Sequence, residues 1–309
     1  MRFARVSGIF GIVAALALAT TPALARENGA PARALGMGDA VRALGMGTSG
    51  LYFNPAGMAQ TMSYAIDLGY GYKSFANGHN GHLSFVDSKT NQELAGGAGY
   101  SYSYADKGGM NTQTHDLRFA VASQFRSKSI QFCYGGGFRY MKVEQDASGG
   151  INDLNKWAPS MDLGVLVGFN DLFYIGVAAQ NIITMQKVKG GANLLVRRPI
   201  APRSVGIGLG INYSILHFGV DVDLDLESKG TNTVTPSPMA GLELTLAQMI
   251  ALRAGFVWDR VGTFDHTQMR ISAGLGYVSK YVGVDVGYAH DVTHVSDWMI
   301  ESSFRVFLP

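Results

Sequence analysis

The feature that most constrains this chain is a two-residue alternation of apolar and polar side chains. In the segment ILHFGVDVDLD, one face carries Leu216, Phe218, Val220, Val222 and Leu224, and the other carries His217, Gly219, Asp221, Asp223 and Asp225. Successive side chains of a β-strand point to opposite faces, so this period predicts strands and not helices. The apolar face is the core in a soluble sandwich. In a membrane barrel it faces lipid, and the polar face lines the lumen.

The alternation recurs along the chain and predicts fourteen strands. Their approximate spans are 63–73, 79–87, 93–104, 114–125, 129–143, 159–169, 172–180, 201–213, 215–226, 238–246, 249–258, 267–278, 281–290 and 297–308. Most of these spans are near the length of about 9–11 residues that a tilted membrane strand needs.

The links between these segments separate the sandwich from the barrel. The links that follow even-numbered strands are short: SKTNQ, RSK, ND, Ser214, AQ and SK. The links that follow odd-numbered strands are longer, roughly six to twenty residues, and this alternation is typical of outer-membrane barrels. The sequence therefore predicts an all-β fold, a 14-stranded antiparallel transmembrane β-barrel over residues 63–309.

The first 25 residues have the three parts of a secretory signal peptide. Arg2 and Arg5 precede an apolar run over 9–19, and Ala23-Leu24-Ala25 is a small-residue cleavage signal. The run is shorter than the roughly 20 apolar residues of a spanning helix, although an uncleaved anchor is the alternative. We therefore expect residues 1–25 to be removed and the mature protein to lie in the outer membrane of a Gram-negative-type cell.

Charge and cysteine content exclude some classes of partner. Of 25 basic and 23 acidic residues, Arg2 and Arg5 belong to the predicted signal peptide, so the mature chain is neutral and no nucleic-acid partner is expected. Cys133 is the single cysteine, which rules out an internal disulfide. No cofactor is expected.

Residues 26–62 lack the strand alternation and repeat the phrase RALGMG, at 33–38 and again at 42–47. Fourteen strands enclose a lumen wider than side chains alone fill. Glycines permit close backbone approach, and Met37, Met46 and Met58 adapt to irregular gaps, so this segment is predicted to fold into the lumen as a plug. A disordered linker is the main alternative. A phosphate cradle lacks the third glycine and the βαβ context.

The stretch ARALGMGDAVRALGMGTSGLYFNPAGMAQ resembles the N-terminal signature of the FadL family, outer-membrane transporters of hydrophobic compounds, and is similar to the related PorV/PorQ proteins. The matching phrases are 36–40 and 52–57, and GVAAQNI with the later PRSVGIGLGINY resembles the middle of such proteins. The resemblance implies fourteen strands and a lumenal N-terminal hatch. Its matching plug residues are Gly36, Met37, Gly38, Asn54, Pro55 and Gly57. The chain departs from the pattern at Asp39, where glycine is usual.

The resemblance implies passive uptake of hydrophobic small molecules such as long-chain fatty acids, with docking on the third and fourth external links. The predicted ligand-binding residues there are Leu154, Trp157, Ile182, Ile183, Met185, Leu194, Leu195, Val196, Arg197 and Arg198. Exposed apolar groups on a loop need a partner surface, and the two arginines could pair with a carboxylate. Alternatively, the loops pack on themselves as a lid and the arginines bind lipopolysaccharide phosphates.

A hydrophobic ligand needs a sideways exit through the wall, which the family forms at a kinked strand. The candidate kinks for this lateral opening are Gly96, Gly97, Gly135, Gly136 and Gly137, since glycine inside a strand marks a bulge or bend. The alternative is that these small residues let the plug pack closely against the wall.

Charged side chains of both signs fall on the predicted lumenal face. They are Asp67, Asp116, Arg118, Arg139, Asp162, Asp221, Asp223, Asp225, Glu243, Arg253, Arg270, Asp285, Glu301 and Arg305. A paired network is the expected arrangement. The four acids at 221, 223, 225 and 243 are a weaker candidate cation site, and no metal is predicted.

Two other functions compete with transport. A PorV-like scaffold or shuttle would hold a secreted protein partner on its external surface. In HDVTHVSD, His294 and Ser296 have the His-x-Ser spacing of outer-membrane lipid A deacylases. Such a short pattern is common by chance, so the chain is predicted not to be an enzyme, with a lipid hydrolase as the remote alternative.

Overall fold

The computed structural model describes residues 30–91, 93–107, 110–147, 154–183, 187–189, 200–227, 234–260 and 268–308. The predicted signal peptide and the first residues of the predicted plug lie outside these ranges.

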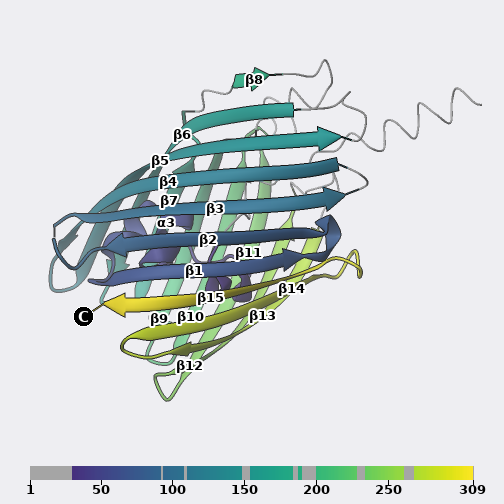
Figure 1. Cartoon of the computed structure of the whole chain (residues 1–309). Coiled ribbons are helices and arrows are strands. Elements are labelled where there is room, and N and C mark those ends of the chain that lie inside the picture. Colours follow the sequence, from purple (N-terminus) through teal and green to yellow (C-terminus); the bar gives the residue numbers. More distant parts are fainter. Residues whose placement is uncertain are drawn as a thin grey trace, which may run out of the picture.

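The described chain is dominated by long strands (Figure 1). They are β1 (Tyr64–Lys73), β2 (Gly78–Asp87), β3 (Ala95–Lys107), β4 (Met110–Arg126), β5 (Ile130–Ala147), β6 (Leu154–Phe169), β7 (Phe173–Gln180), β9 (Ser204–Tyr213), β10 (Leu216–Asp225), β11 (Thr235–Leu246), β12 (Ile250–Asp259), β13 (Gln268–Val278), β14 (Val282–Asp291) and β15 (Trp298–Leu308). The short β8 (Lys187–Lys189) pairs with the outer part of β6.

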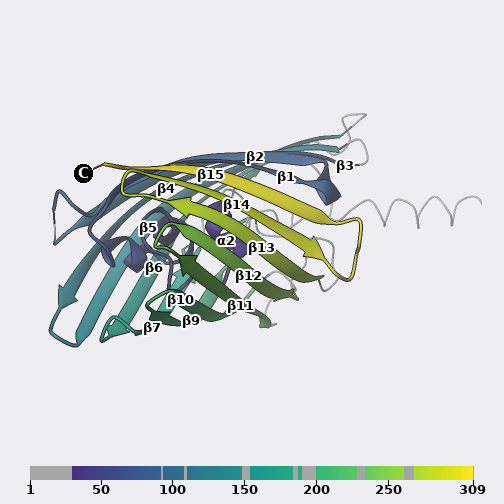
Figure 2. The same cartoon turned by 90° about the horizontal axis from the view of Figure 1, so that it is seen from below.

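Neighbouring strands are antiparallel and form one sheet that closes on itself. Each strand pairs with the next along the chain, except that β7 pairs with β9 across the β8 segment. The first and last strands, β1 and β15, pair along ten positions from Tyr64↔Leu308 to Lys73↔Met299 (Figure 2). The predicted 14-stranded antiparallel barrel is confirmed, with β8 as a small addition at its rim.

The alternation in the sequence places polar side chains in the lumen and apolar side chains on the outer face of the barrel. On β10, Asp221, Asp223 and Asp225 are buried in the lumen, whereas Leu216 and Phe218 are exposed on the outer face. A continuous ladder leaves a closed barrel no unpaired edge, which is the condition for a sheet in contact with lipid.

The two ends of the barrel differ. At the turn end, hairpin turns such as 170–172, 214–215 and 247–249 reverse the chain with residues in the left-handed region, among them Asn170 and Ser214. The opposite end, the loop end, carries the links after β1, β3, β5, β7, β10, β12 and β14 (Figure 1).

The predicted alternation of link lengths is wrong at the link between β3 and β4, and the link between β5 and β6 is shorter than predicted. Only residues 108–109 separate β3 from β4, and the expected third link at 144–158 shrinks because β5 continues to Ala147 and β6 begins at Leu154. The ladder extends into polar sequence through pairs such as Tyr104 with Gln113 and Asp106 with Asn111. Strand pairing needs backbone partners and not an apolar face, so hydropathy alone underestimates these strands.

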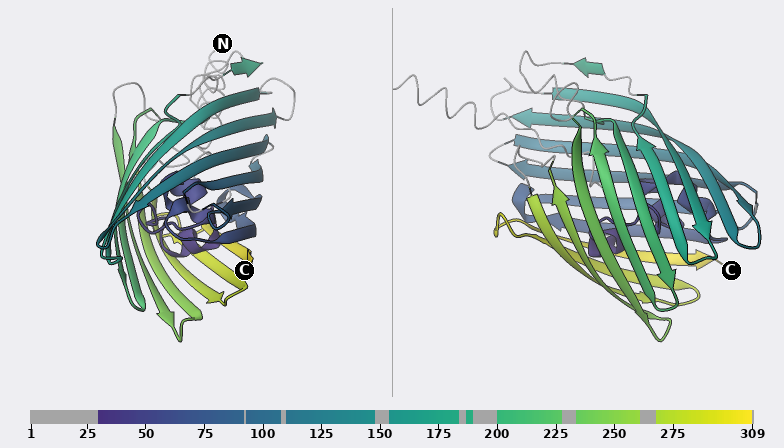
Figure 3. Two further views of the ribbon diagram at one scale, coloured as in Figure 1. Left: turned by 90° about the vertical axis from the view of Figure 1, so that its left-hand side faces the viewer. Right: turned by 180° about the vertical axis from the view of Figure 1, so that it is seen from behind.

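Residues 30–63, the N-terminal segment, lie inside the barrel (Figure 3, left). The segment contains α2 (Ala32–Gly36), α3 (Thr48–Phe53) and the 3₁₀ helix η2 (Pro55–Ala59), and most of its residues are buried. A second short 3₁₀ helix, η3 (Ser74–Ala76), connects β1 to β2 at the loop end. Within the described part of the chain, no helix has the length and hydropathy needed to cross a membrane.

Candidate functional site

The RALGMG repeat of the sequence is also a structural repeat. Arg33 and Arg42, the first residues of the two copies, both reach carboxylates of the wall. Gly38 and Gly47, the last residues, both have φ of +57°, a left-handed conformation that glycine adopts without a steric penalty. Each copy therefore fixes one side chain to the wall and then turns the chain.

The polar contacts of the repeat are buried and directed. Arg33 donates to both oxygens of Glu243 at 3.0 and 3.1 Å. The guanidinium of Arg42 lies 3.6 Å from Asp221 and from Asp223, and the Arg42 backbone N–H donates to Asp221 at 2.8 Å. These carboxylates, three of the four in the weak candidate cation site, are thus partnered by arginines. Among the described residues, no group of acids, histidines and cysteines is arranged to hold a metal.

A band of glycines in the barrel wall allows the N-terminal segment to pack closely against it. A Cβ at Gly241 would lie 2.2 Å from the carbonyl oxygen of Met37, and one at Gly219 would lie 2.2 Å from that of Ala40. Each of ten strands contributes at least one contacting glycine: Gly287 of β14, Gly274 of β13, Gly255 of β12, Gly241 of β11, Gly219 of β10, Gly208 of β9, Gly176 of β7, Gly164 of β6, Gly135 of β5 and Gly97 of β3. The segment follows these strands around the inside of the wall, and we call these glycines the glycine track.

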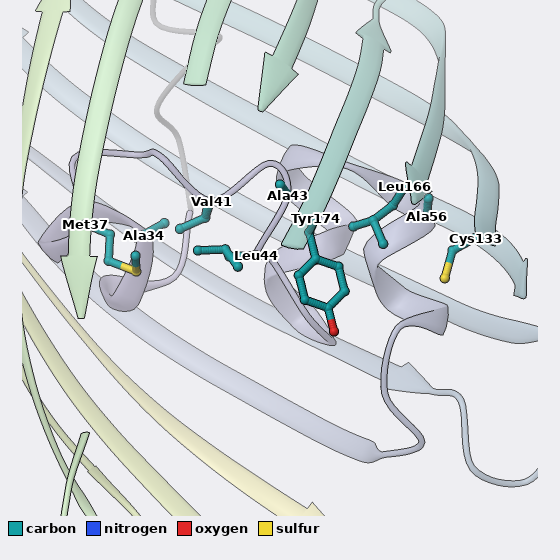
Figure 4. Packing of buried hydrophobic residues seen from close by; sticks show 9 residues of the cluster. All are labelled: Ala34, Met37, Val41, Ala43, Leu44, Ala56, Cys133, Leu166 and Tyr174. Carbon is teal, nitrogen blue, oxygen red and sulfur yellow. The ribbon is translucent and has the colours of Figure 1, made fainter. Parts of the chain in front are cut away.

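The predicted plug residues all lie in this contact zone. Met37 is fully buried among Ala34, Val41 and Leu44 of the segment, in a cluster that continues to Cys133, Leu166 and Tyr174 of the wall (Figure 4). Gly36 meets β13, Gly38 meets β12 and Gly57 packs on Gly45 within the segment. Asn54 and Pro55 contact β6 and β5.

The charged residues of the lumenal face form the expected paired network. Arg253 joins Glu243 at 2.5 Å to Asp285 at 2.6 Å. Arg305 then pairs with Asp67 at 2.8 Å, and Asp67 accepts a bond from Thr48 of the N-terminal segment. A second group on the opposite wall contains Asp116, which both Arg118 and Arg139 contact at 2.6–2.8 Å.

A cavity of about 60 Å³ lies between the N-terminal segment and the loop end of the barrel. Its walls are Ala30, Asp39, Arg42, Tyr52, Phe53, Arg118, Arg139, Gln180, Asn181, Pro202, Ser204, Asp223, Asp225, Met239, Val257, Asp259 and Arg270. Arg118 and Gln180 donate to the carbonyl oxygen of Tyr52 at the end of α3. Burial raises the pKa of Tyr52 to about 12, with Arg118 beside its ring acting in the opposite direction, so the phenol is neutral in ordinary conditions.

The predicted ligand-binding residues do not gather in this cavity. Trp157 is on the outer face of β6, where its ring lies 6.3 Å from that of Tyr140, and Leu154 begins the same strand. Ile182 is half-buried and Ile183 is exposed just after β7. Met185, Leu194, Leu195, Val196, Arg197 and Arg198 lie outside the described residues.

The glycines proposed for a lateral opening lie in continuously paired strands. β3 pairs with β4 through Gly96 and Gly97, and β5 pairs with both neighbours through 135–137. Gly97 and Gly135 belong to the glycine track and accommodate Met58 and Pro55. In this conformation the wall is closed at these positions.

The histidine and serine of the last loop have separate partners. His294 Nδ1 lies 3.0 Å from the hydroxyl of Thr293, and Ser296 donates to Asp297 at 2.8 Å. Both residues are exposed at the loop end.

Sequence reasoning named Gly97 and Gly135 of the glycine track, with close packing of the plug as their alternative role. It missed the other glycines of the track and the two repeat arginines as site residues. The arginines carried a signal, because a repeated phrase that begins with the same charged residue marks two equivalent contacts. The missed glycines carried no such signal. Each lies at a lumenal position of an alternating strand, and the neighbouring sequence does not distinguish a glycine in close contact with the segment from one that faces empty space.

Comparison with known proteins gives matches of structure but not of sequence. No protein-family model and no curated protein matches this chain. The toluene transporter TbuX of Ralstonia pickettii superposes with a TM-score of 0.60 at 12% identity, covering 91% of this chain and 97% of that chain. A FadL homologue of Pseudomonas aeruginosa superposes with a TM-score of 0.61 at 11% identity, covering 94% of this chain and 99% of that chain. The chain therefore shares the fold of these two proteins.

Proposed function

We propose that this protein is an outer-membrane channel for the passive entry of small hydrophobic molecules, closed by its N-terminal segment acting as a plug. The observation that carries the proposal is a barrel whose lumen is occupied by its own chain along the glycine track. A filled lumen does not serve as an open aqueous pore, so entry requires the segment to move.

The outer surface supports a membrane location. Large apolar side chains are exposed around the outside of the wall, among them Leu68, Leu163, Leu209 and Leu275 at 54–57% exposure. Aromatic rings are grouped toward the loop end, where Tyr72 and Tyr288 flank Trp298. An apolar band bordered by aromatic rings is the exterior of a transmembrane barrel, with lipid and lipopolysaccharide as its surroundings.

The proposed route has three steps. A molecule such as a fatty acid docks on the loop surface near Ile182 and Ile183, the segment shifts from the track, and the molecule leaves sideways through the wall. The fold shared with the toluene transporters supports this class of ligand. For the exit we retain β3 and β5, where Gly97 and Gly135 would lose their packing partners once the segment moved.

A pair of glycine substitutions tests the proposal. Gly241→Ala places a methyl group 2.2 Å from a carbonyl oxygen of the segment, whereas Gly81→Ala in β2 adds one whose nearest atom is 3.6 Å away. The measurement is entry of the hydrophobic dye N-phenylnaphthylamine into cells that carry each variant, the parent protein or none. We expect faster entry with the parent than without it, a several-fold increase for Gly241→Ala, and no change for Gly81→Ala.

Equal dye entry with and without the parent protein would refute the channel. If the parent instead co-purified with a stoichiometric secreted protein, the scaffold function would replace it.

A further inference from the structure

The cavity between the N-terminal segment and the loop end borders one line of strand pairing that is incomplete. We call the boundary between two neighbouring strands a seam. At the β11–β12 seam, pairing ends at Met239↔Val257, although residues 235–238 and 258–260 are all described. Met239, Val257 and, beyond this last pair, Asp259 line the cavity. On their other sides, β11 stays paired with β10, and β12 with β13, to the ends of both strands.

Two prolines account for the early end of this ladder. Thr245 of β11 donates its N–H to Ile215 at 2.7 Å, on the β10 side, and alternate residues of a regular strand face the same neighbour. The β10–β11 register runs without interruption, so the even-numbered residues of β11, including Pro236 and Pro238, face β12. Because proline has no N–H, the two donors that would continue the β11–β12 ladder are missing.

A serine side chain joins the two strands in place of that ladder. The hydroxyl oxygen of Ser237 accepts from the N–H of Arg260 at 3.2 Å, and the hydroxyl donates to Asp259 at 3.4 Å. Ser237 is fully buried. A hydroxyl changes partners by rotating about a single bond, so this contact opens more readily than a backbone ladder.

Other seams that border the cavity keep backbone bonds beside it. The β7–β9 and β9–β10 seams are both paired in the strand that begins at Ser204, which lines the cavity. At the β6–β7 seam, regular pairing ends at Leu163↔Ala179, but further along the N–H of Ile182 donates to the carbonyl oxygen of Met161 at 2.9 Å. Within the described chain, the β11–β12 seam is therefore the part of the cavity wall with the least backbone pairing.

We propose that the β11–β12 seam opens at the loop end as a side entrance, through which hydrophobic molecules dissolved in the outer leaflet reach the cavity. This inference rests on the proposed function and adds lipid, besides the loop surface, as the phase that supplies the transported molecule. The longer loops of outer-membrane barrels are external, so the loop end lies at the outer leaflet. Opening breaks the two bonds of Ser237 before any ladder bond, and Met239 and Val257 offer the entering molecule apolar contacts.

The test is photolabelling of the protein in phosphatidylcholine vesicles that contain palmitate with a diazirine on its chain. Irradiation attaches this probe to the residues that it contacts, and mass spectrometry locates them. We expect label on the lumenal Met239 and Val257 as well as on Leu242, which is exposed on the outer face of β11 and serves as the reference. Label on Leu242 with none on either lumenal residue overturns the proposal.

Restoring the missing donors should close the side entrance. The double variant Pro236→Val/Pro238→Val supplies two N–H groups toward β12, and these bonds should lower the label on Met239, relative to Leu242, at least about tenfold. Pro159→Val in β6 is the matched control, because the β5–β6 ladder already passes through this position and no described residue pairs with it on the β7 side. The control should leave the ratio unchanged. If the folded double variant is labelled on Met239 as the parent is, molecules do not enter at this seam.

A variant that loosens the seam gives an independent reading. Ser237→Ala removes both hydroxyl bonds and should raise the label on Met239 and Val257 several-fold, and an unchanged label would count against the side entrance. Folding of each variant is checked by the heat-dependent gel shift of the intact barrel.

Dye entry into cells reports the proposed channel separately. Lumenal label that falls in the double variant, without dye entry, would support the side entrance and refute the channel. Dye entry without lumenal label would refute the side entrance alone.

Discussion

At the scale of single residues, Asn54 holds the N-terminal segment to itself and to the wall. Its amide nitrogen donates to the carbonyl oxygens of Arg42 and Val165, both at 3.2 Å, and its side-chain oxygen accepts from the N–H of Ala56. The side chain is fully buried, so each of these groups would lack a water replacement. One amide thus connects the repeat, η2 and strand β6.

We expect Asn54→Ala to free the N-terminal segment while the barrel remains folded. Leaving buried groups unpaired costs roughly 1–3 kcal/mol each, so the loss should be about 2–5 kcal/mol. Limited proteolysis of the protein in liposomes measures it, as faster cleavage before β1. Asn111→Ala, which removes an exposed amide bonded to Tyr104, is the control and should leave cleavage unchanged. Equal protection of both variants would show that the segment does not depend on this amide.

The sequence predicted the role of a single residue only where a short phrase or the strand alternation around it carried the information. Asn54 and Pro55 stood in a recognisable NPAG phrase, and the lumenal placement of Asp221 and Glu243 followed from strand alternation. Arg33 and Arg42 became partners of those acids only through contacts between residues 210 and 179 positions apart, respectively. No spacing rule in one sequence reaches that far.

At the scale of elements, Asn181 fixes the end of strand β7, where the chain leaves the wall and enters the fourth external link. Asn181 turns the chain out of the strand with φ of +57° and is buried. Its N–H donates to Asp162 at 2.7 Å, its amide oxygen accepts from Ser160 at 3.0 Å, and its amide nitrogen donates to Pro202 at 2.9 Å. These bonds anchor the start and the end of the fourth external link to β6.

We expect Asn181→Ala to loosen the end of β7. Both Asn181 and Asn170 adopt the left-handed region, where alanine is strained by about 1–2 kcal/mol, but Asn170 is exposed in a turn. Asn181→Ala should therefore cost about 2–4 kcal/mol more than Asn170→Ala, because it also removes buried hydrogen bonds. Hydrogen exchange of the β7 amides is the measurement, and similar exchange in the two variants would contradict the anchoring role.

The element boundaries show what sequence reasoning can supply. The spans of β9 to β15 follow the prediction within a few residues, because apolar and polar positions alternate to their ends. The sequence pattern predicted loops where the loop-end parts of β4 to β6 lie, because polar residues occupy both faces of the strands there. Lys142 and Glu144 pair along β5 at 2.8 Å, and Asn155 of β6 donates to Glu144 at 3.2 Å, so polar contacts replace apolar ones there.

At the scale of the whole molecule, the apolar exterior implies that stability depends on depth in the bilayer. Leu209→Arg places a charge at the middle of β9, where the side chain is 54% exposed. This should cost about 2–4 kcal/mol, and the same change at Ile215 in the turn after β9 should cost about 0–1 kcal/mol. Unfolding by urea in lipid vesicles measures both. Equal costs would mean that the band does not lie in lipid.

The pairing of β1 with β15, the seam that closes the barrel, bears on how the barrel is assembled. Strands β1 and β15 meet although their paired residues are roughly 230 positions apart in sequence, so their contact carries the greatest loop-closure entropy of the wall. The N-terminal segment directly precedes β1 and lies inside the closed wall. If the β1–β15 seam closes with the segment already in place, the interior chain is enclosed without having to enter through either mouth.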